Sequence, residues 1–402
     1  MLPLEGIRII ELSAYMNGPS AGYQLADLGA DVVKIELPRR GDSSRGIESL
    51  FGTFMTVDGV NLMFDTLNRG KRSLTLDLRK QKGKEVLYRL VEKADVFFTN
   101  YRKDQVVELG VDYNTLSQYN PQLIYALGTA FGTRGPESHL RAYDPIIQGY
   151  SGLMMTMGEE GMPPIVVSGA LMDQMGGTML ANSIVTALLV RERQGIGQEV
   201  EVSMLGGSIH LQYLNINTYF LKGRPMGRIT RSLQRNPLTL NYQCSDGKWI
   251  ILSELQSDRY WDQFCTAIGK EELKDDPRFD SAKKRRKTYL ELISILEETF
   301  ATQTRDEWFK IFSKKCPFAY GPIHTVEEAA ESEQVKANEY VVEVGHPILG
   351  RIRRTGVPIR FSKTPGKPKA GAPELGQHTE EVLLEFGYSW DEISALREEK
   401  VI

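Results

Sequence analysis

The chain has 402 residues, of which 41% are hydrophobic and 25% are charged, as in ordinary globular proteins. A chain of this length can form two or three domains with a sizeable core. Its formal net charge of −3 provides no overall attraction to nucleic acid or to an anionic membrane, so neither is expected as a partner.

The first third of the chain alternates between strand and helix patterns. A short apolar strand is predicted over residues 6–13, a helix over 20–30 and a second strand over 31–38. This order makes a βαβ unit, which implies a parallel sheet. The alternation continues with strands at 73–78, 95–100 and 123–128 and a helix at 83–94. The sequence therefore predicts a doubly wound α/β fold, whose ligands sit beyond the carboxyl ends of the strands.

The rest of the chain is less regular. An apolar segment over 178–190 reads as a buried helix, and Asp173 precedes it together with Gly176 and Gly177. After residue 220 a basic stretch without periodicity, 223–238, reads as a linker or substrate loop. A smaller unit follows, with a hairpin turn at Asp246-Gly247 and helices at 258–268, 287–301 and 305–314. The C-terminal part begins β-rich and ends in helices.

The cysteines and the first residues bear on the compartment. Cys244, Cys265 and Cys316 are widely spaced, which argues against a disulfide framework and against a zinc site. The opening "MLPLEGIRIIEL" lacks the basic and apolar regions of a signal peptide. No apolar run reaches the roughly 18 residues of a membrane span. We therefore expect a soluble cytoplasmic protein that binds no metal.

Several common catalytic motifs are absent from the sequence. There is no G-x-G-x-x-G after the first strand, no P-loop, no H-E-x-x-H and no G-x-S-x-G. The five histidines are isolated, and no convincing Ser/His/Asp set emerges. Hydride transfer, nucleotide hydrolysis and serine hydrolysis are therefore disfavoured.

Cations gather where the predicted N-terminal strands begin or end. They follow the second strand, precede the third and follow the fourth: Arg39, Arg40, Arg45, Arg69, Lys71, Arg72 and Arg102. Singly, such residues most often solvate loops. Together with Asn68 and Asn100 in equivalent loops, they favour a phosphate-rich ligand.

Asp173 is the one acid in the stretch "VVSGALMDQMGGTMLAN" (166–182), and it allows two interpretations. Asp is a favoured helix N-cap, so it could simply cap the apolar helix. Alternatively, the amides at the helix start stabilise its carboxylate, and Gly176 and Gly177 let a backbone or a substrate approach. A carboxylate in such a place can attack a reactive acyl group.

Seven stretches, in this order, resemble the class III coenzyme A (CoA) transferases, the family of formyl-, crotonobetainyl- and phenyllactate-type CoA transferases. They are residues 11–46, 68–78, 95–102, 142–154, 166–182, 197–205 and 375–383. The resemblance spans nearly the whole chain. No single stretch is decisive, but seven in the right order are highly specific.

The resemblance implies an architecture that periodicity cannot show. Family members are interlocked dimers of ring-like chains, each with a Rossmann-like large domain and a smaller α+β domain. The implied division is 1–200 for the N-terminal part of the large domain, 201–225 for a linker, 226–330 for the small domain and 331–402 for a linker and the C-terminal part. A homodimer is expected, and a heteromer with a related subunit is the alternative.

The resemblance also places Asp173 at the family's catalytic aspartate. The implied mechanism begins with attack of Asp173 on an acyl-CoA thioester, which gives an aspartyl–acyl anhydride. The released CoA converts this to an aspartyl-CoA thioester, which the acceptor acid then attacks. CoA thioesters are thus substrates, and no permanently bound cofactor, metal or ATP is implied.

Other positions match CoA contacts of the family. Those implied are Tyr15, Met16, Asn17 and Tyr143 near the thioester, Arg39 or Arg40 with Lys71 and Arg72 at the adenosine phosphates, and Asn100, Tyr101, Arg102 and Met204 as further CoA contacts. Tyr143 and Met204 could instead belong to the core. Glu108 departs from the family, which often has a basic residue there, and this puts one phosphate contact in doubt.

The acceptor acid is less well specified. The segment "RSLQRNPLTLNY" differs from the glycine-rich loop of oxalate-using members, so a larger acid, aromatic or hydroxylated, is expected, with succinyl-CoA a candidate donor. Arg231, Arg235 and Asn236 are weak candidates for binding it, or they serve the structure.

Two other functions stay open. An α-methylacyl-CoA racemase would share the fold but needs a histidine where this chain has Tyr143, and a phenol with a pKa of about 10 is a poor base near neutrality. A non-catalytic CoA-binding subunit of a heteromeric transferase is the second, against which the presence of Asp173 argues.

Overall fold

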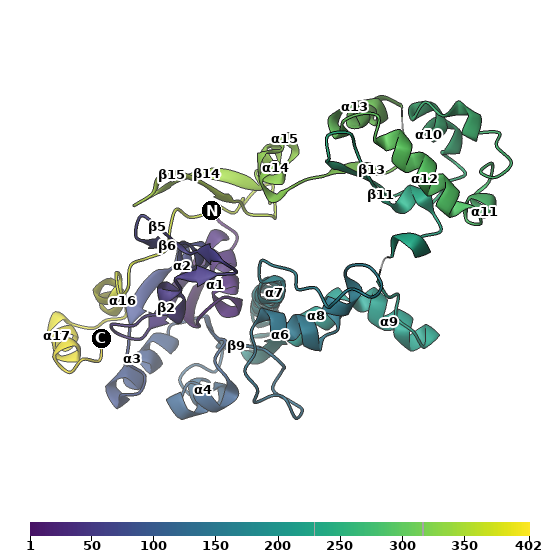
Figure 1. Cartoon of the computed structure of the whole chain (residues 1–402). Coiled ribbons are helices and arrows are strands. Elements are labelled where there is room, and N and C mark those ends of the chain that lie inside the picture. Colours follow the sequence, from purple (N-terminus) through teal and green to yellow (C-terminus); the bar gives the residue numbers. More distant parts are fainter. Residues whose placement is uncertain (229, 316) are drawn as a thin grey trace. The chain divides into compact units, whose positions relative to one another are not determined.

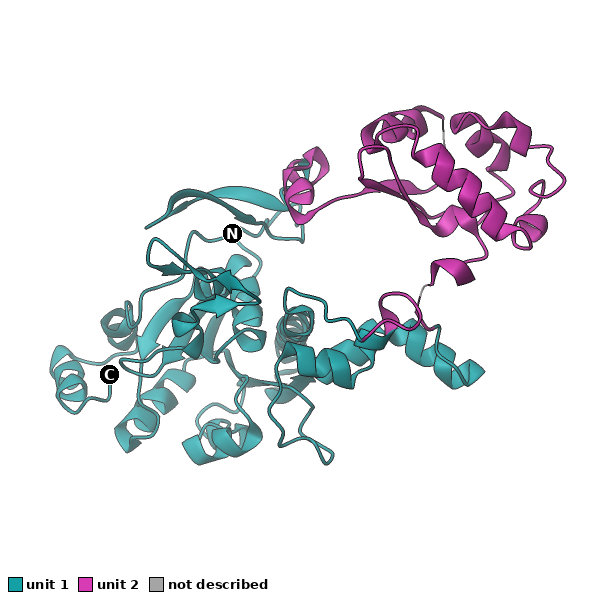
Figure 2. Cartoon of the chain, viewed as in Figure 1, with its two compact units in different colours: residues 1–155, 164–226, 337–402 teal, residues 156–163, 227–336 magenta. Residues whose placement is uncertain are grey.

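The computed structural model describes residues 1–228, 230–315 and 317–402, so Cys316 lies outside the described residues. The chain divides into two compact units (Figure 2). Unit 1 comprises residues 1–155, 164–226 and 337–402, and unit 2 comprises residues 156–163 and 227–336. Each unit has its own hydrophobic core.

Unit 1 is built on a six-stranded parallel sheet, as the sequence predicts, in the order β10-β9-β8-β1-β2-β7 (Figure 1). The strands are β1 (Arg8–Leu12), β2 (Asp31–Glu36), β7 (Arg72–Thr75), β8 (Val96–Thr99), β9 (Ile124–Thr129) and β10 (Gln198–Ser203). In register, Ile10 lies between Val33 of β2 and Phe97 of β8. Since β1 leads to β2 on one side and has β8 on the other, the strand order reverses between β1 and β8. The loops that follow these two strands therefore diverge, which is where such folds bind ligands.

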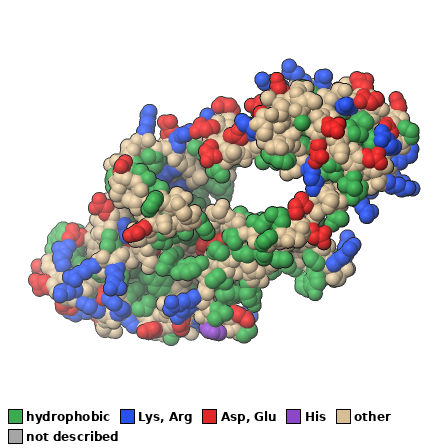
Figure 3. Space-filling view, in the orientation of Figure 1, with side chains coloured by type: hydrophobic (Ala, Val, Ile, Leu, Met, Phe, Trp, Pro, Cys, Tyr) green, Lys and Arg blue, Asp and Glu red, His purple; other side chains and the backbone are tan. Residues whose placement is uncertain are grey.

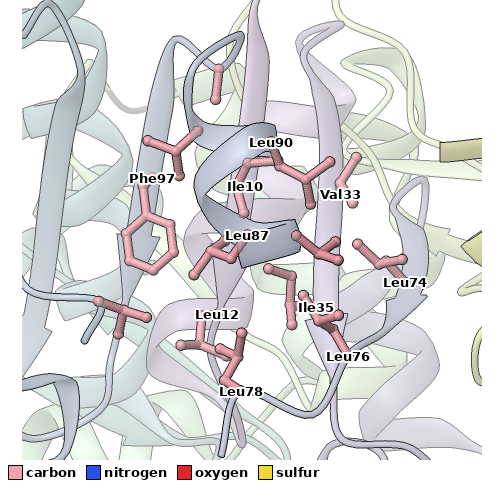
Figure 4. Close-up of a cluster of buried hydrophobic side chains, with 14 of the residues drawn as sticks. Ile10, Leu12, Val33, Ile35, Leu74, Leu76, Leu78, Leu87, Leu90 and Phe97 are labelled. Atoms are coloured by element: carbon pink, nitrogen blue, oxygen red, sulfur yellow. The ribbon is translucent and has the colours of Figure 1, made fainter. Parts of the chain in front are cut away.

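Helices cover both faces of this sheet, because successive side chains of a strand point to opposite faces. On one face, Leu87 and Leu90 of α3 (Gln81–Val91) pack on Ile10, Val33 and Phe97 (Figure 4). Helices α16 (Thr379–Glu385) and α17 (Trp390–Glu398), from the end of the chain, pack into the same cluster. The opposite face carries α1 (Asn17–Asp27) and α7 (Leu171–Gln194).

Helices α1 and α7 approach each other at the Gly176-Gly177 pair. A Cβ on Gly177 would lie 1.7 Å from Ser20 Oγ and 2.7 Å from the carbonyl oxygen of Asn17, so only glycine fits. The backbone that these glycines admit is therefore that of α1. Helix α7 also begins seven residues before the predicted apolar segment, so Asp173 lies inside its first turn rather than ahead of it.

Unit 2 contains a three-stranded antiparallel sheet, β11-β12-β13 (Asn241–Gln243, Trp249–Leu252 and Tyr320–Ile323). The predicted hairpin joins β11 to β12, with Gly247 in the left-handed conformation. The three predicted helices are present as α10 (Trp261–Ala267), α12 (Tyr289–Phe300) and α13 (Arg305–Lys315). Their core is rich in aromatic side chains, among them Phe300, Trp308 and Phe312.

The remaining elements are short. In unit 1 they are β3 (Ser49–Leu50), β4 (Thr53–Phe54), β5 (Thr56–Val57), β6 (Val60–Asn61), α2 (Leu62–Asn68), α4 (Lys103–Leu109), α5 (Tyr113–Leu116), α6 (Asp144–Tyr150), α8 (Met204–Leu211), α9 (Tyr213–Lys222), β14 (Val341–His346) and β15 (Gly350–Thr355). In unit 2 they are α11 (Ala282–Arg285) and α14 (Val326–Glu331), and α15 (Glu333–Ala337) ends at the boundary. Within the described ranges, no helix has the length and apolar character that a membrane crossing requires.

The glycine contact gives a stability prediction. Gly177→Ala should lower the free energy of unfolding by about 1–3 kcal/mol, because the new methyl group overlaps Ser20 and the backbone of α1. Gly149→Ala is the matched control, since its Cβ would meet only Met154 at an ordinary 3.6 Å and alanine favours a helix. Urea denaturation measures both; equal stability of the two variants would contradict the packing constraint.

Candidate active site

The loop that follows β1 is fixed by side chains from neighbouring strands. Asn100, at the end of β8, accepts a hydrogen bond from Ala14 N at 3.0 Å and donates one to Ala14 O at 2.8 Å. The N–H of Tyr15 donates to Asp42 Oδ1 at 3.1 Å. Tyr15 has a left-handed backbone with φ of 65°, which is unusual for a residue with a side chain. The loop therefore holds a strained conformation that its surroundings impose.

The residue that follows this loop contacts Asp173. Asn17, the first residue of α1, is buried, and its Nδ2 donates to the backbone oxygen of Asp173 at 3.3 Å. Met16, just before it, is partly buried, and its carbonyl accepts from Ser20 N. Of the predicted residues 15–17, Asn17 thus contacts the backbone of Asp173 directly.

Asp173 does not cap its helix. The N-cap position of α7 is Ala170, whose φ of 54° is left-handed, and the capping oxygen comes from Asp144. Asp144 Oδ2 accepts from Met172 N at 2.5 Å and from Asp173 N at 3.2 Å. The N-cap interpretation of Asp173 is therefore wrong, and its carboxyl group does not cap the helix.

Asp144 is a residue that the sequence analysis missed. It is the first residue of α6, is 4% exposed, and reaches the start of α7 from a position 29 residues away. Its second oxygen accepts from Gln148 Nε2. The sequence "YDPII" marks a helix start with Pro145 in its first turn, but no local pattern shows that Asp144 caps a second helix.

Burial, together with the smaller effect of the Asp144 charge, raises the pKa of Asp173 to about 7. Near neutral pH the carboxyl group is therefore divided between its acid and its anionic form. An anion that is poorly solvated and kept beside a helix start is suited to nucleophilic attack. This is the clearest chemical capability of the site.

Two aromatic rings come from the segments that contact the Asp173 backbone. Tyr143, the residue before Asp144, is 58% exposed, and its ring meets that of Tyr15 edge-on with centroids 5.6 Å apart. Tyr143 is thus not a core residue. Met204, at the start of α8, is buried with Ile147 and Met172, as its alternative interpretation expects.

A basic cavity of about 520 Å³ lies elsewhere in unit 1. It is lined by Arg39 and by residues of β7 and of the loop that follows, and by the end of the chain, where Lys and Arg gather (Figure 3). Its cations are Arg39, Arg79, Lys80, Arg397 and Lys400. Apart from Arg39, these residues were missed, since four lie outside the predicted strand-end clusters and two come from the last six residues.

The five cations of this cavity differ in their partners. Arg79 pairs with Asp77 and Arg397 with Glu380, while Lys80 donates to the carbonyls of Glu399 and Lys400. Within the described part of the chain, no ion pair or hydrogen bond involves the side chains of Arg39 and Lys400. Both have left-handed backbones, with φ of 68° and 56°. These two charges are therefore available to a ligand.

The other predicted phosphate contacts lie apart from this cavity. Lys71 is buried and its ammonium group contacts Glu11 at 2.8 Å, while Arg72 pairs with Asp31, Glu381 and Glu385. Arg40 is exposed, and Arg102 pairs with Asp104. The strand-end cations therefore do not gather round one point, because most already hold carboxylates of the protein.

Two further predicted positions lie near the same sheet. Tyr101, after β8, is partly buried against the core, and burial raises the pKa of its hydroxyl. Glu108 is exposed on α4, where its carbonyl accepts from Lys84. Among the described residues, neither Tyr101 nor Glu108 forms a hydrogen bond or an ion pair with Asp173.

The three acceptor candidates lie in unit 2. Arg231 pairs with Glu297 at 2.8 Å and lines an open hollow of about 480 Å³. Asn236 accepts from Leu238 N and donates to Glu254 O. Arg235 is exposed. Arg231 and Asn236 therefore stabilise unit 2, whatever else they bind. Among the described residues, no group of His, Cys, Asp and Glu is placed to hold a metal ion.

Comparison with known proteins gives a consistent result. The sequence profile of CoA-transferase family III matches residues 4–379. The chain is 34% identical to succinate–glutarate CoA-transferase of Agrobacterium fabrum over 96% of both chains. It is 32% identical to cinnamoyl-CoA:phenyllactate CoA-transferase of Clostridium sporogenes, over 99% of this chain and 96% of the relative. The crystal structure of a CAIB/BAIF family protein from Brucella suis superposes with a TM-score of 0.84 at 31% identity, covering 96% of this chain and 99% of that one.

The environment of Asp173 predicts a pH-dependent stability cost. The pKa of its carboxyl is about 7 in the fold against 3.8 when unperturbed, so folding favours the protonated form. The cost is absent below pH 3.8, grows through the interval and is complete above pH 7. Asp173→Asn should therefore raise the free energy of unfolding more at pH 8 than at pH 5, as measured by urea denaturation. An equal gain at both pH values would contradict the raised pKa.

Proposed function

The chain belongs to CoA-transferase family III, and from this premise we propose that it moves CoA from an acyl-CoA donor to an organic acid through covalent intermediates on Asp173. The observation that carries the proposal is the state of the Asp173 carboxyl group: it caps no helix, it is partly buried, and its pKa is raised to about 7.

The chemistry proceeds in four displacements at carbonyl carbon. The Asp173 carboxylate attacks the thioester, a C–O bond forms, the C–S bond breaks, and CoA leaves as a thiolate. The thiolate then attacks the Asp173 carbonyl of the anhydride and expels the donor acid, which leaves an aspartyl-CoA thioester. The acceptor carboxylate attacks this thioester and releases the thiolate again. Attack of the thiolate on the acceptor's acyl carbon gives the product and restores Asp173.

Asp144 makes this role of Asp173 possible. Because it already accepts the N–H groups of Met172 and Asp173, the Asp173 carboxyl has no helix end to satisfy. The negative charge of Asp144 also destabilises the Asp173 anion relative to the neutral acid. Forming the anhydride removes the negative charge of Asp173. The repulsion is thus relieved as the covalent bond forms.

The loop residues Tyr15, Met16 and Asn17 would face the thioester, and Asn100 holds the loop in place. Arg39 and Lys400, the unpaired cations of the basic cavity, would take the adenosine phosphates. Arg40, Lys71, Arg72, Tyr101, Arg102, Tyr143 and Met204 stay predictions as CoA contacts, and the ion pairs of Lys71 and Arg72 make those two the weakest.

The acceptor is proposed to be larger than oxalate. One relative acts, by its name, on phenyllactate and another on glutarate, so an aryl hydroxy acid and a dicarboxylic acid are the two candidates. The exposed rings of Tyr15 and Tyr143 favour the first, because they pack together on the two segments that contact the Asp173 backbone and provide an apolar wall for an aryl group. Succinyl-CoA remains a candidate donor.

A cytoplasmic homodimer of interlocked chains is proposed, with the domain boundaries that the family resemblance implies. Helix α9 supports an assembly, because none of its residues is buried within the described chain, and Phe220 and Leu221 are 74% and 85% exposed. The racemase alternative is not favoured: the neighbouring Tyr15 hydroxyl and burial raise the pKa of Tyr143, which makes it a still poorer base.

Covalent trapping tests the function. The protein is incubated with a panel of acyl-CoAs, quenched with hydroxylamine and mapped by peptide mass spectrometry. A donor-dependent hydroxamate on Asp173 is expected, and the other carboxylates in the digest are internal controls. Asp173→Ala should abolish transfer while CoA binding, measured by calorimetry, changes by no more than a few-fold. A variant that kept most of the transfer rate would end the nucleophile proposal.

The unpaired cations predict a separable effect on CoA affinity. Lys400→Gly removes the charge, so KM for the acyl-CoA should rise about tenfold, as expected for one charge-assisted phosphate contact. The stability should not fall, because glycine adopts the left-handed backbone of this position without strain. Dephospho-CoA substrates locate the contact, because the variant loses less affinity for them if Lys400 binds the 3′-phosphate. Lys283→Gly in α11 of unit 2 is the control; unchanged KM in Lys400→Gly would remove this residue from the CoA site.

A further inference from the structure

Four charged side chains are buried together: one from β1, one from β2, one from the loop after β2 and one from the residue just before β7. Glu11, Lys34, Asp42 and Lys71, here called the Glu11 cluster, all have fully buried side chains. Lys34 Nζ lies 3.1 Å from Glu11 and 2.9 Å from Asp42, and Lys71 Nζ lies 2.8 Å from Glu11. Burying such charges is costly, and apolar side chains of similar size often serve a core as well or better. The cluster therefore calls for an explanation beyond packing.

The two lysines of the cluster are held by groups of the protein. An ammonium group has three N–H donors. Lys34 Nζ meets Glu11, Asp42 and the Ser13 carbonyl, the last at 2.7 Å. Lys71 Nζ meets Glu11, the Asn68 amide oxygen and the Pro19 carbonyl. Lys71 is thus held by three hydrogen bonds and Lys34 by two hydrogen bonds and an ion pair, so the protein itself occupies both cations.

Every member of the cluster is also connected to residues 13–19, here called the β1–α1 segment. Lys34 and Lys71 donate to its carbonyls at Ser13 and Pro19. Glu11 accepts from Ser13 Oγ at 2.7 Å, and Asp42 accepts from Tyr15 N at 3.1 Å. Contacts of charged groups thus hold both ends and the middle of the segment.

The segment is the part of the fold that meets Asp173. It carries Asn17, which donates to the Asp173 carbonyl, and Tyr15, whose left-handed backbone persists only if its surroundings enforce it. We propose that the Glu11 cluster is a positioning device that sets the β1–α1 segment against Asp173 for acyl transfer, with Asp42 as its decisive contact through the Tyr15 N–H. Its link to acyl transfer rests on the proposed function, whereas its hold on the segment does not.

Asp42 variants test the proposal kinetically. Asp42→Ala removes the acceptor of Tyr15 N and should slow single-turnover acylation of Asp173 at least tenfold, because small misplacements of reacting groups cost that much or more. KM for the acyl-CoA should change less than threefold. Asp42→Asn keeps an acceptor oxygen and should recover most of the rate. The matched control is Asp27→Asn, which weakens the equally buried Arg69–Asp27 pair, 2.6 Å apart and without contact to the segment.

Amide hydrogen exchange of the same proteins provides a readout that needs no catalysis. Exchange at residues 13–19 should accelerate in Asp42→Ala and stay at the wild-type rate in Asp27→Asn. Equal loss of acylation in both variants, or unchanged exchange in Asp42→Ala, would overturn the positioning role. If the wild-type protein forms no adduct with any acyl-CoA, the proposed function fails, and the exchange rates still decide whether the cluster holds the segment.

Discussion

The close approach of α1 to α7 at Gly176 and Gly177 is the constraint on which the site depends. A side chain at either glycine would collide with Asn17 or Ser20, so the two helices can touch only where both positions lack a Cβ. That contact brings the start of α1 to the first turn of α7. The loop after β1 thereby becomes a neighbour of Asp173, as the hydrogen bond from Asn17 to the Asp173 backbone oxygen shows; these two residues are 156 positions apart in the sequence.

At this junction the fold accepts a cost in stability. Asp144 and Asp173 meet at one helix start, and burial together with the charge of Asp144 keeps the Asp173 anion at high energy. The amides of Met172 and Asp173 at this helix start donate to Asp144 and not to the Asp173 carboxyl group. A carboxylate that the surroundings leave poorly stabilised is a better nucleophile than a capping one. Such local conflicts are typical of functional sites.

Local patterns in the sequence predict the scaffold better than the site. Runs such as that of β1 and turn residues such as Asp246-Gly247 encode strands and a hairpin by their own chemistry, and both are present. The interpretation of Asp173 as an N-cap fails because the capping oxygen belongs to another helix, which no local pattern reveals. The family is indicated only by seven stretches in order, since no one of them carries a unique physical signal.

The partners of each cation show whether its charge is used within the protein or is available to a ligand. The spacing of cations in the sequence does not show this. Arg72 looked like a phosphate ligand, yet it pairs with Glu381 and Glu385 of α16. Those pairs hold the C-terminal segment against β7, and that segment carries Lys400 to the cavity that Arg39 also lines. Arg72 therefore contributes to this cavity indirectly, by fixing the segment that lines it. Arg39, which follows β2, and Lys400, near the end of the chain, line one cavity because the chain's last helices pack on the same sheet.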